Sequence, residues 1–304
     1  MDDFKLKNFE NVLARCRELG KIILSVAVAQ DEEVLRAVWA AQDEGLADAV
    51  LVGDAEKIRG IAGPERADSL NIIHEPDDAA AARKACSLVR DGAADALMKG
   101  LINTSDFLKA VLAPESGLRT GSLLSHLAVF EVPGQSKLQF HTDGGINISP
   151  GLPEKKEILM NALRALAAIG IRNPKVAVLS ANEKINPKMP STTDAQALSD
   201  MRKSGQIPLG IVEGPIALDV AISPQAALHK GIRSEISGDV DLFLVPNIES
   251  GNLLGKAMIY FAKAKMAGLV LGAACPIVLT SRAETAEGKL HSIAMASLVA
   301  RSLA

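Results

Sequence analysis

The sequence predicts a doubly wound α/β protein with mostly parallel sheets in two domains. Apolar runs of strand length alternate with amphipathic segments of helix length along nearly the whole chain, which is the pattern of successive βαβ units. The 304 residues, 48% of them hydrophobic, exceed the size of one ordinary domain and can form two cores. Neither a repeat nor a linker rich in proline or serine interrupts the pattern, so we expect the second domain to be inserted into the first.

In the first part of the chain, continuous aliphatic runs predict strands, and apolar residues at helical spacing behind an Asp or Asn cap predict helices. The strands are expected at residues 21–29, 49–52 and 94–98. The helices are expected at residues 31–44, at 77–90, and from a cap at 103–106 to about 112. The third strand delivers Lys99 and Gly100 at its carboxyl end.

The alternation of strands and helices is interrupted near residue 122. Residues 123–131 and 137–141 flank a turn-rich segment, which predicts an antiparallel hairpin. A long helix is expected at residues 154–168, with Pro153 suited to its first position. Further strands are expected at residues 176–180, 210–212 and 242–245, a turn at 214–219, and helices at 194–203, 224–230 and 251–264.

The apolar run 267–279 predicts a buried strand that leads into a final helix at residues 284–302. This helix can return the chain to the first domain. We therefore expect a first domain of residues 1–122 and 277–304, and a second domain of residues 123–276.

Composition excludes several classes of function. A net charge of −3 and a pI near 6.0 argue against a nucleic-acid-binding protein, and 3% aromatic residues weakens base stacking further. The three cysteines are far apart and form no CxxC pair, which favours a reducing cytoplasm. The N-terminus lacks the apolar core of a signal peptide, and the run 267–279 is too short to span a bilayer, so no membrane association is expected.

Motifs for nucleotides and metals are also missing. The sequence contains no GxGxxG, no GxxxxGK[ST], no HExxH and no GxSxG, and its five histidines are scattered. What remains is a set of polar groups that follow the predicted strands. They lie at residues 99–105, 180–184, 247–252 and 280–282. Because ligands bind beyond the carboxyl ends of parallel strands, four such groups favour a polar cleft, although each alone could be a helix cap or a turn.

The last of these groups has two interpretations. Ser281 followed by Glu284 fits the capping box, in which two side chains satisfy backbone donors at a helix start. Arg282 favours an anion pocket instead, because a cap needs no guanidinium whereas a phosphate or an enolate-like oxygen does.

Taken together, five segments resemble the phosphate acetyl/butyryltransferase family. The segments are residues 96–100, 117–122, 214–219, 245–252 and 276–282. The most specific are Pro-Asn-x-Glu-x-Gly-Asn, which ends at Asn252, and Ser-Arg-Ala, which begins at Ser281. The resemblance covers essentially the full chain, and residues 281–284 with 289–293 look more like the phosphate butyryltransferase branch than the acetyl-specific one.

The resemblance implies a fold like that of isocitrate and isopropylmalate dehydrogenases, with a cleft between two domains. It implies reversible acyl transfer between a short-chain acyl-CoA, butyryl-CoA or acetyl-CoA, and inorganic phosphate, which gives an acyl phosphate and CoA. Coenzyme A is then a substrate, no metal and no tightly bound cofactor are required, and the protein forms a homodimer or a larger homo-oligomer.

The resemblance also implies roles for individual residues. Ser281 assists the phosphate, and Arg282 neutralises the charge that develops on oxygen. In the acetyl-specific branch, a carboxylate seven residues beyond the serine serves as the base that removes the thiol proton, whereas this chain has Gly288 at that position. Glu284 or Glu287 could act as the base instead. Alternatively, no base is needed, because a thiol with a pKa near 8.5 ionises readily. The substrate-binding residues are expected to be Lys99, Asn103, Thr104, Arg119, Ser122, Asn247, Glu249 and Asn252.

Two other functions are compatible with the same architecture. One is a decarboxylating dehydrogenase that depends on NAD and a metal, which requires clustered aspartates and an adenine-binding loop. The other is a noncatalytic protein that binds acyl-CoA.

Overall fold

The computed structural model describes residues 6–281 and 284–303. The chain divides into two compact units, which are described separately. Unit 1 comprises residues 1–7 and 123–265, and unit 2 comprises residues 8–122 and 266–304. The domain limits expected from the sequence, at residues 122 and 276, stay a prediction.

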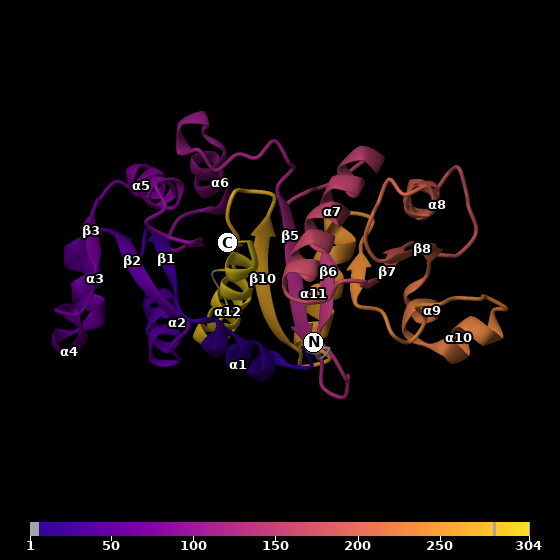
Figure 1. The fold of residues 1–304 in the computed structure, drawn as a ribbon, viewed down its shortest axis with the longest axis horizontal. Coiled ribbons are helices and arrows are strands. Elements are labelled where there is room, and N and C mark those ends of the chain that lie inside the picture. Colours follow the sequence, from indigo (N-terminus) through magenta and orange to yellow (C-terminus); the bar gives the residue numbers. More distant parts are fainter. Residues whose placement is uncertain (1–5, 282–283, 304) are drawn as a thin grey trace. The chain divides into compact units, whose positions relative to one another are not determined.

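Unit 2 is organised around strands in the order β3-β2-β1-β4-β11-β10. Figure 1 labels β3, β2, β1 and β10 in this order. These strands are β1 (Ile22–Ala27), β2 (Ala47–Gly53), β3 (Ile72–His74), β4 (Ala96–Lys99), β10 (Lys265–Leu271) and β11 (Ile277–Val278). Strands β3, β2, β1, β4 and β11 run parallel to one another, and β10 is antiparallel to β11. Strands β1 and β2 are buried along almost their whole length, which explains their continuous aliphatic sequence.

The helices of unit 2 begin where the sequence offers a capping side chain. They are α1 (Phe9–Leu19), α2 (Glu32–Asp43), α3 (Ala55–Ala62), α4 (Pro64–Ala67), α5 (Asp78–Arg90), α6 (Thr104–Leu112), the 3-10 helix η1 (Pro114–Ser116) and α12 (Ala286–Leu303). The side chains of Asp31, Asp77 and Asn103 each accept a backbone N–H of the following helix, as the sequence predicts. Helices α1, α2 and α12 pack together, and α5 packs against α6 and β1.

The chain order of these strands reverses between β1 and β4. From β1 the chain proceeds through α2 to β2 and then to β3, whereas α5 carries it back past β1 to β4. Because such crossovers are right-handed, the reversal leaves the carboxyl ends of β1 and β4 as a topological switch point, where α/β sheets bind ligands.

Unit 1 has strands in the order β5-β6-β9-β7-β8. They are β5 (Ser125–Glu131), β6 (Gln139–Thr142), β7 (Lys175–Leu179), β8 (Ile211–Ile216) and β9 (Leu242–Leu244). Strands β5 and β6 form the predicted antiparallel hairpin, and β6, β9, β7 and β8 are parallel. The expected turn at 214–219 is wrong in its first half, because Gly214, Pro215 and Ile216 belong to β8.

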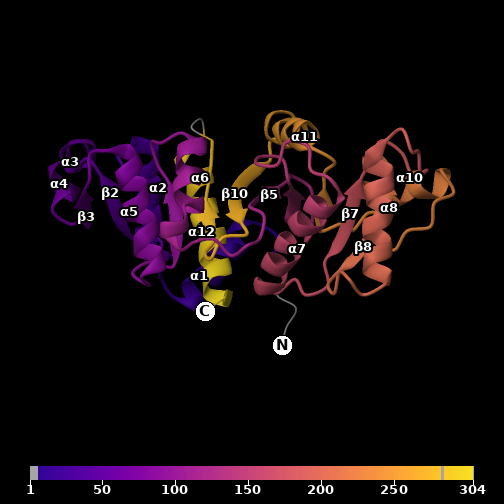
Figure 2. The same ribbon diagram turned by 90° about the horizontal axis from the view of Figure 1, so that it is seen from above.

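The helices of unit 1 are α7 (Leu152–Ala168), α8 (Pro190–Lys203), α9 (Leu218–Ile222), α10 (Pro224–His229) and α11 (Ile248–Tyr260). Figure 2 shows α8 lying along β7 and β8. A proline in the first turn starts α7, α8 and α10, because that position has no intrahelical partner for an N–H. Helix α8 therefore begins at Pro190, earlier than the predicted residue 194. Within the described ranges, no helix is both long and apolar enough to cross a bilayer.

The apolar run 267–279 is not the single strand that the sequence predicts. Strand β10 ends at Leu271, and after a turn the short β11 returns beside it, pairing Leu269 with Val278. Strand β11 then lies parallel to β4, with Val278 opposite Met98. This fold-back brings the segment that follows β11 to the carboxyl end of β4.

Candidate active site

In unit 2 the predicted site residues follow two neighbouring parallel strands. Lys99 ends β4, and Val278 ends β11, pairing with the residue before Lys99. Ser281 follows β11 after two further residues and is exposed. The structure thus brings Ser281 and the Lys99 segment to the same edge of the sheet, as the sequence predicts. Arg282 lies outside the described residues.

The carboxyl ends of β1 and β4 approach each other unusually closely. Gly100 N–H donates to the carbonyl of Ala27 at 2.8 Å, and Leu101 N–H donates to that of Val28 at 2.7 Å. A Cβ at Gly100 would lie 2.2 Å from the carbonyl oxygen of Val28, so only glycine fits. Val28 itself is buried with a φ of 57°, a strained conformation for a β-branched residue. Such strain is typical of functional sites.

Lys99 is buried in this turn. Its ammonium donates to the carbonyls of Gly100 at 3.1 Å and of Ile102 at 2.9 Å, which fixes the path of the chain after β4. Asn103 then caps α6, accepting the N–H of Asp106 at 2.9 Å, and Thr104 is the exposed first residue of that helix. The alternative role of Asn103 as a helix cap is therefore confirmed, whereas contact of Lys99, Asn103 and Thr104 with substrate stays a prediction.

The start of α12 is capped by residues other than Ser281 and Glu284. Gly288 N–H donates to Thr285 Oγ1 at 3.1 Å, and Ala286 N–H donates to Glu33 Oε2 from α2 at 2.9 Å. The capping-box interpretation is therefore wrong in its position, because α12 begins at Ala286 rather than 284. Glu284 precedes the helix; its N–H donates to the carbonyl of Ser281 at 3.1 Å, and its side chain is half-buried.

Arg119 and Ser122 lie on a segment that is hydrogen-bonded to the turn after β10. Arg119 forms an isolated bridge with Ala273, and Thr120 Oγ1 donates to the carbonyl of Gly272 at 2.6 Å. Ser122 N–H donates in turn to Thr120 Oγ1 at 3.2 Å. This turn precedes β11 whereas Ser281 follows it, so the structure places the exposed Arg119 at the other end of that strand.

In unit 1 the predicted residues gather at the start of α11. Asn247 follows β9 and caps the helix, with Oδ1 accepting the N–H of Ser250 at 3.0 Å and its hydroxyl at 2.6 Å. Glu249 and Asn252 lie exposed in the first turns. The unpaired N–H groups and partial positive charge of a helix N-terminus suit an anionic ligand.

A loop after β6 completes this end of unit 1, and sequence reasoning missed it. The buried carboxylate of Asp143 accepts the N–H groups of Gly145 at 2.8 Å, Ile146 at 2.9 Å and His126 at 3.0 Å. It also accepts both the backbone N–H of Asn147, at 3.3 Å, and its side-chain amide, at 2.7 Å. The sequence Asp-Gly-Gly after a strand signals a turn, but nothing local shows that its carboxylate is buried.

This loop lies directly against α11. A Cβ at Gly251 would be 2.6 Å from the Cα of Gly144, so neither position can carry a side chain without moving backbone. Beside the loop, burial lowers the pKa of His126, and the nearby Asp143 opposes this shift only in part. His126 is therefore neutral near pH 7. Across residues 6–281 and 284–303, no group of three or more His, Cys, Asp or Glu side chains is arranged to hold a metal ion.

Comparisons with known proteins identify the family. The model of the phosphate acetyl/butaryl transferase family matches residues 70–297. Phosphate butyryltransferase of Clostridium acetobutylicum is 48% identical over 97% of this chain and 99% of that protein. A branched-chain phosphotransacylase from Enterococcus faecalis V583 has a similar structure, with a TM-score of 0.82 and 36% identity over 91% of this chain and 99% of that one.

The predicted dehydrogenase-like architecture is confirmed as well. The 4-hydroxythreonine-4-phosphate dehydrogenase of Klebsiella pneumoniae matches with a TM-score of 0.59 over 92% of this chain and 99% of that one. Its 16% identity shows a shared fold alone. By its sequence matches and its structure, the chain belongs to the phosphate acetyl/butaryl transferase family.

Proposed function

We propose that this protein reversibly transfers a short acyl group, butyryl or acetyl, between coenzyme A and inorganic phosphate. The observation that carries the proposal is the 48% identity to a phosphate butyryltransferase over 97% of the chain. The placement of Ser281 beyond the end of β11, which pairs with β4, supports it, because α/β sheets bind ligands beyond the carboxyl ends of their strands. A hydroxyl there can donate a hydrogen bond to the oxygen on which negative charge develops during acyl transfer.

In the proposed reaction, the sulfur of coenzyme A attacks the carbonyl carbon of the acyl phosphate. A C–S bond forms, and the bond between the carbonyl carbon and the bridging oxygen of the acyl phosphate breaks. Inorganic phosphate leaves with that oxygen, and the thiol proton passes to a base. Ser281 donates a hydrogen bond to the phosphate, and Arg282, assigned from the sequence alone, compensates the charge that develops on oxygen. Glu284 takes the proton, since Thr285 and Glu33 already cap α12 and leave its carboxylate unneeded for that purpose.

The remaining residues are proposed to bind the substrates. Residues after β4 would hold acyl or phosphate oxygens, and the segment around Arg119 would contact the anionic part of coenzyme A. The full set is Lys99, Asn103, Thr104, Arg119, Ser122, Asn247, Glu249 and Asn252. No tightly bound cofactor takes part, because coenzyme A enters and leaves as a substrate.

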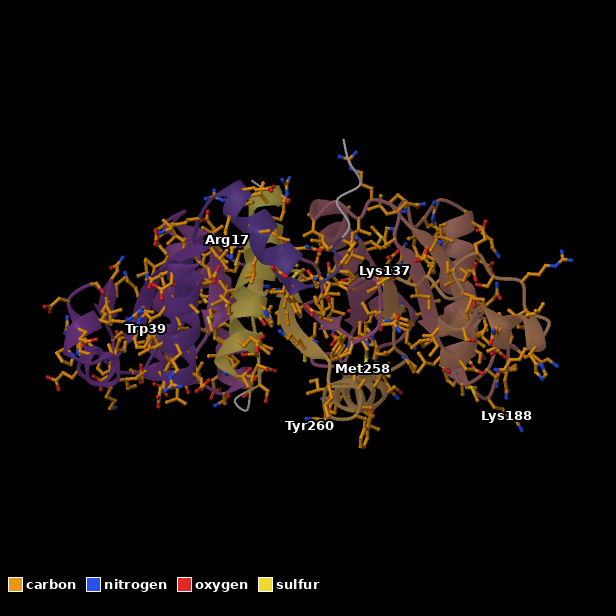
Figure 3. The ribbon with its side chains drawn as sticks, turned by 90° about the horizontal axis from the view of Figure 1, so that it is seen from below. Arg17, Trp39, Lys137, Lys188, Met258 and Tyr260 are labelled. Carbon is orange, nitrogen blue, oxygen red and sulfur yellow. The ribbon has the colours of Figure 1, made fainter. Side chains whose placement is uncertain are left out.

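We also propose that the protein is a cytoplasmic homodimer or larger homo-oligomer. Its three cysteines are unpaired and buried, as suits a reducing compartment. Helix α11 and the residue after it expose Leu253, Tyr260 and Phe261 by 69%, 65% and 87%, and a second copy would cover them. Figure 3 shows Met258 and Tyr260 on this helix. Light scattering after size-exclusion chromatography measures the mass; a monomer would contradict the assembly.

Thiol release from butyryl-CoA and acetyl-CoA, with and without phosphate, tests the activity. We expect Ser281→Ala to lower kcat by about 100-fold, the effect of removing one donor to a developing anion, with little change in coenzyme A affinity. Ser302→Ala is the matched control, because Ser302 lies in the last turn of α12 and should leave the rate unchanged. The proposal is rejected if the parent protein shows no phosphate-dependent release from either acyl-CoA, and retained coenzyme A binding would then indicate a noncatalytic protein.

A further inference from the structure

Gly288 occupies a position in the first turn of α12 where a side chain would collide with Glu284. A Cβ built on Gly288 lies 2.3 Å from Oε1, 2.7 Å from Cδ and 2.9 Å from Cγ of Glu284. These distances are far below van der Waals contact. The carboxylate of Glu284 therefore lies where any other residue at position 288 would begin its side chain.

The backbone of Glu284 is held on both sides. Its N–H donates to the carbonyl of Ser281 at 3.1 Å, and its own carbonyl accepts a hydrogen bond from the buried ammonium of Lys289. Its Oε1 accepts the N–H of Thr285 at 3.2 Å. With the backbone fixed, an added methyl group at position 288 must displace the carboxylate rather than the chain.

The first turn of α12 does not need this carboxylate for its own stability. Ala286 N–H donates to Glu33, Gly288 N–H donates to the hydroxyl of Thr285, and Lys289 N–H donates to the carbonyl of Thr285 at 3.0 Å. Displacing the carboxylate of Glu284 should therefore leave the helix intact. A change at position 288 can move one functional group while the fold persists.

We propose that Gly288 is a positioning residue, whose missing side chain leaves the space that the Glu284 carboxylate occupies against the first turn of α12. The inference rests on the proposed function, in which Glu284 accepts the thiol proton. A base must lie within hydrogen-bond reach of the proton that it removes, so displacing it by the width of a methyl group affects the chemical step more than substrate binding.

The test is a double-mutant cycle of Gly288→Ala and Glu284→Ala, with steady-state rates of butyryl transfer. We expect Gly288→Ala to lower kcat by at least 10-fold with KM for phosphate within twofold of the parent value. In the Glu284→Ala background the same change should have no further effect, because the methyl group then meets no carboxylate.

Gly60→Ala is the matched control, because Gly60 lies inside α3 and an added Cβ there meets no atom within 4 Å among the described residues. Its kcat should equal that of the parent. Thermal unfolding followed by circular dichroism checks that every variant is folded.

Two outcomes separate this inference from the function on which it rests. A parent protein without phosphate-dependent thiol release overturns both. An active parent whose Gly288→Ala variant keeps its full kcat, or loses the same factor with and without Glu284, overturns the positioning role alone.

Discussion

Replacing the buried His141 by leucine should reduce the acid sensitivity of the fold. His141 lies on β6 with its ring between those of Phe130 and Phe243, at centroid distances of 4.8 and 5.0 Å. Neither ring nitrogen has a hydrogen-bond partner among the described residues. Burial therefore lowers the pKa of His141 from 6.5 to about 3.

The sign of the effect follows from proton binding. Between pH 6.5 and about 3, the unfolded chain binds a proton at His141 that the folded chain does not. The free energy of unfolding is thus unaffected by this group above pH 6.5 and decreases below it by about 1.4 kcal/mol per pH unit. From pH 7 to pH 5 the loss amounts to about 2 kcal/mol. Leucine does not titrate, so the difference between His141→Leu and the parent protein should shift by that amount in favour of the variant.

Urea unfolding followed by far-ultraviolet circular dichroism at pH 7, 6 and 5 measures this difference. Circular dichroism is preferable to fluorescence, because the single Trp39 lies in unit 2 whereas His141 lies in unit 1. His126 is present in both proteins, so its own titration cancels. His229→Gln changes an exposed histidine on α10 and should follow the parent curve. A stability difference between His141→Leu and the parent that stays constant from pH 7 to pH 5 would refute the reasoning.

Two further predictions concern buried charges in unit 1. Asp143→Ala removes the acceptor of four backbone N–H groups and one side-chain amide. It should lower the free energy of unfolding by about 3 kcal/mol or more and abolish acyl transfer. Urea unfolding that shows the stability of the parent protein would contradict this prediction. Lys155 Nζ lies 2.7 Å from Asp194 Oδ2, with side chains only 6% and 18% exposed. Asp194→Ala leaves this ammonium unpaired and should lower the free energy of unfolding by about 3 kcal/mol. Adding Lys155→Met to that variant should restore most of the lost stability. If the two substitutions instead destabilise the protein additively, the pairing is contradicted.

The parts of the fold that depend on local chemistry were predictable from the sequence. Asn103 and Asn247 stand one residue before their helices, and each side chain accepts a backbone N–H three residues later. The hairpin of β5 and β6 was likewise predictable, because a turn with proline and glycine separates two apolar runs. These signals involve neighbouring residues only, so tertiary packing did not override them.

The fold-back of β10 and β11 was not predictable in the same way. A continuous apolar run has no periodicity that separates one long strand from two short antiparallel ones. The capping box of the last helix was expected to begin at Ser281. Thr285 becomes the cap because α12 begins at Ala286 and the carboxylate of Glu33 from α2 takes its first N–H, a contact between segments far apart in the sequence.

Some features of the candidate site could not be predicted from motifs, because they depend on the close approach of segments that are distant in the sequence. Gly100 lies against the carbonyl of Val28, and Gly251 lies against Gly144, both at the carboxyl ends of strands where predicted ligand residues follow. At each place the sequence shows a glycine but not the segment that needs its missing side chain. Gly288 extends the same principle to a functional group, since what approaches there is the carboxylate of Glu284. If acyl transfer depends on these approaches, a single added methyl group at Gly288 perturbs the chemistry as selectively as removing the carboxylate itself.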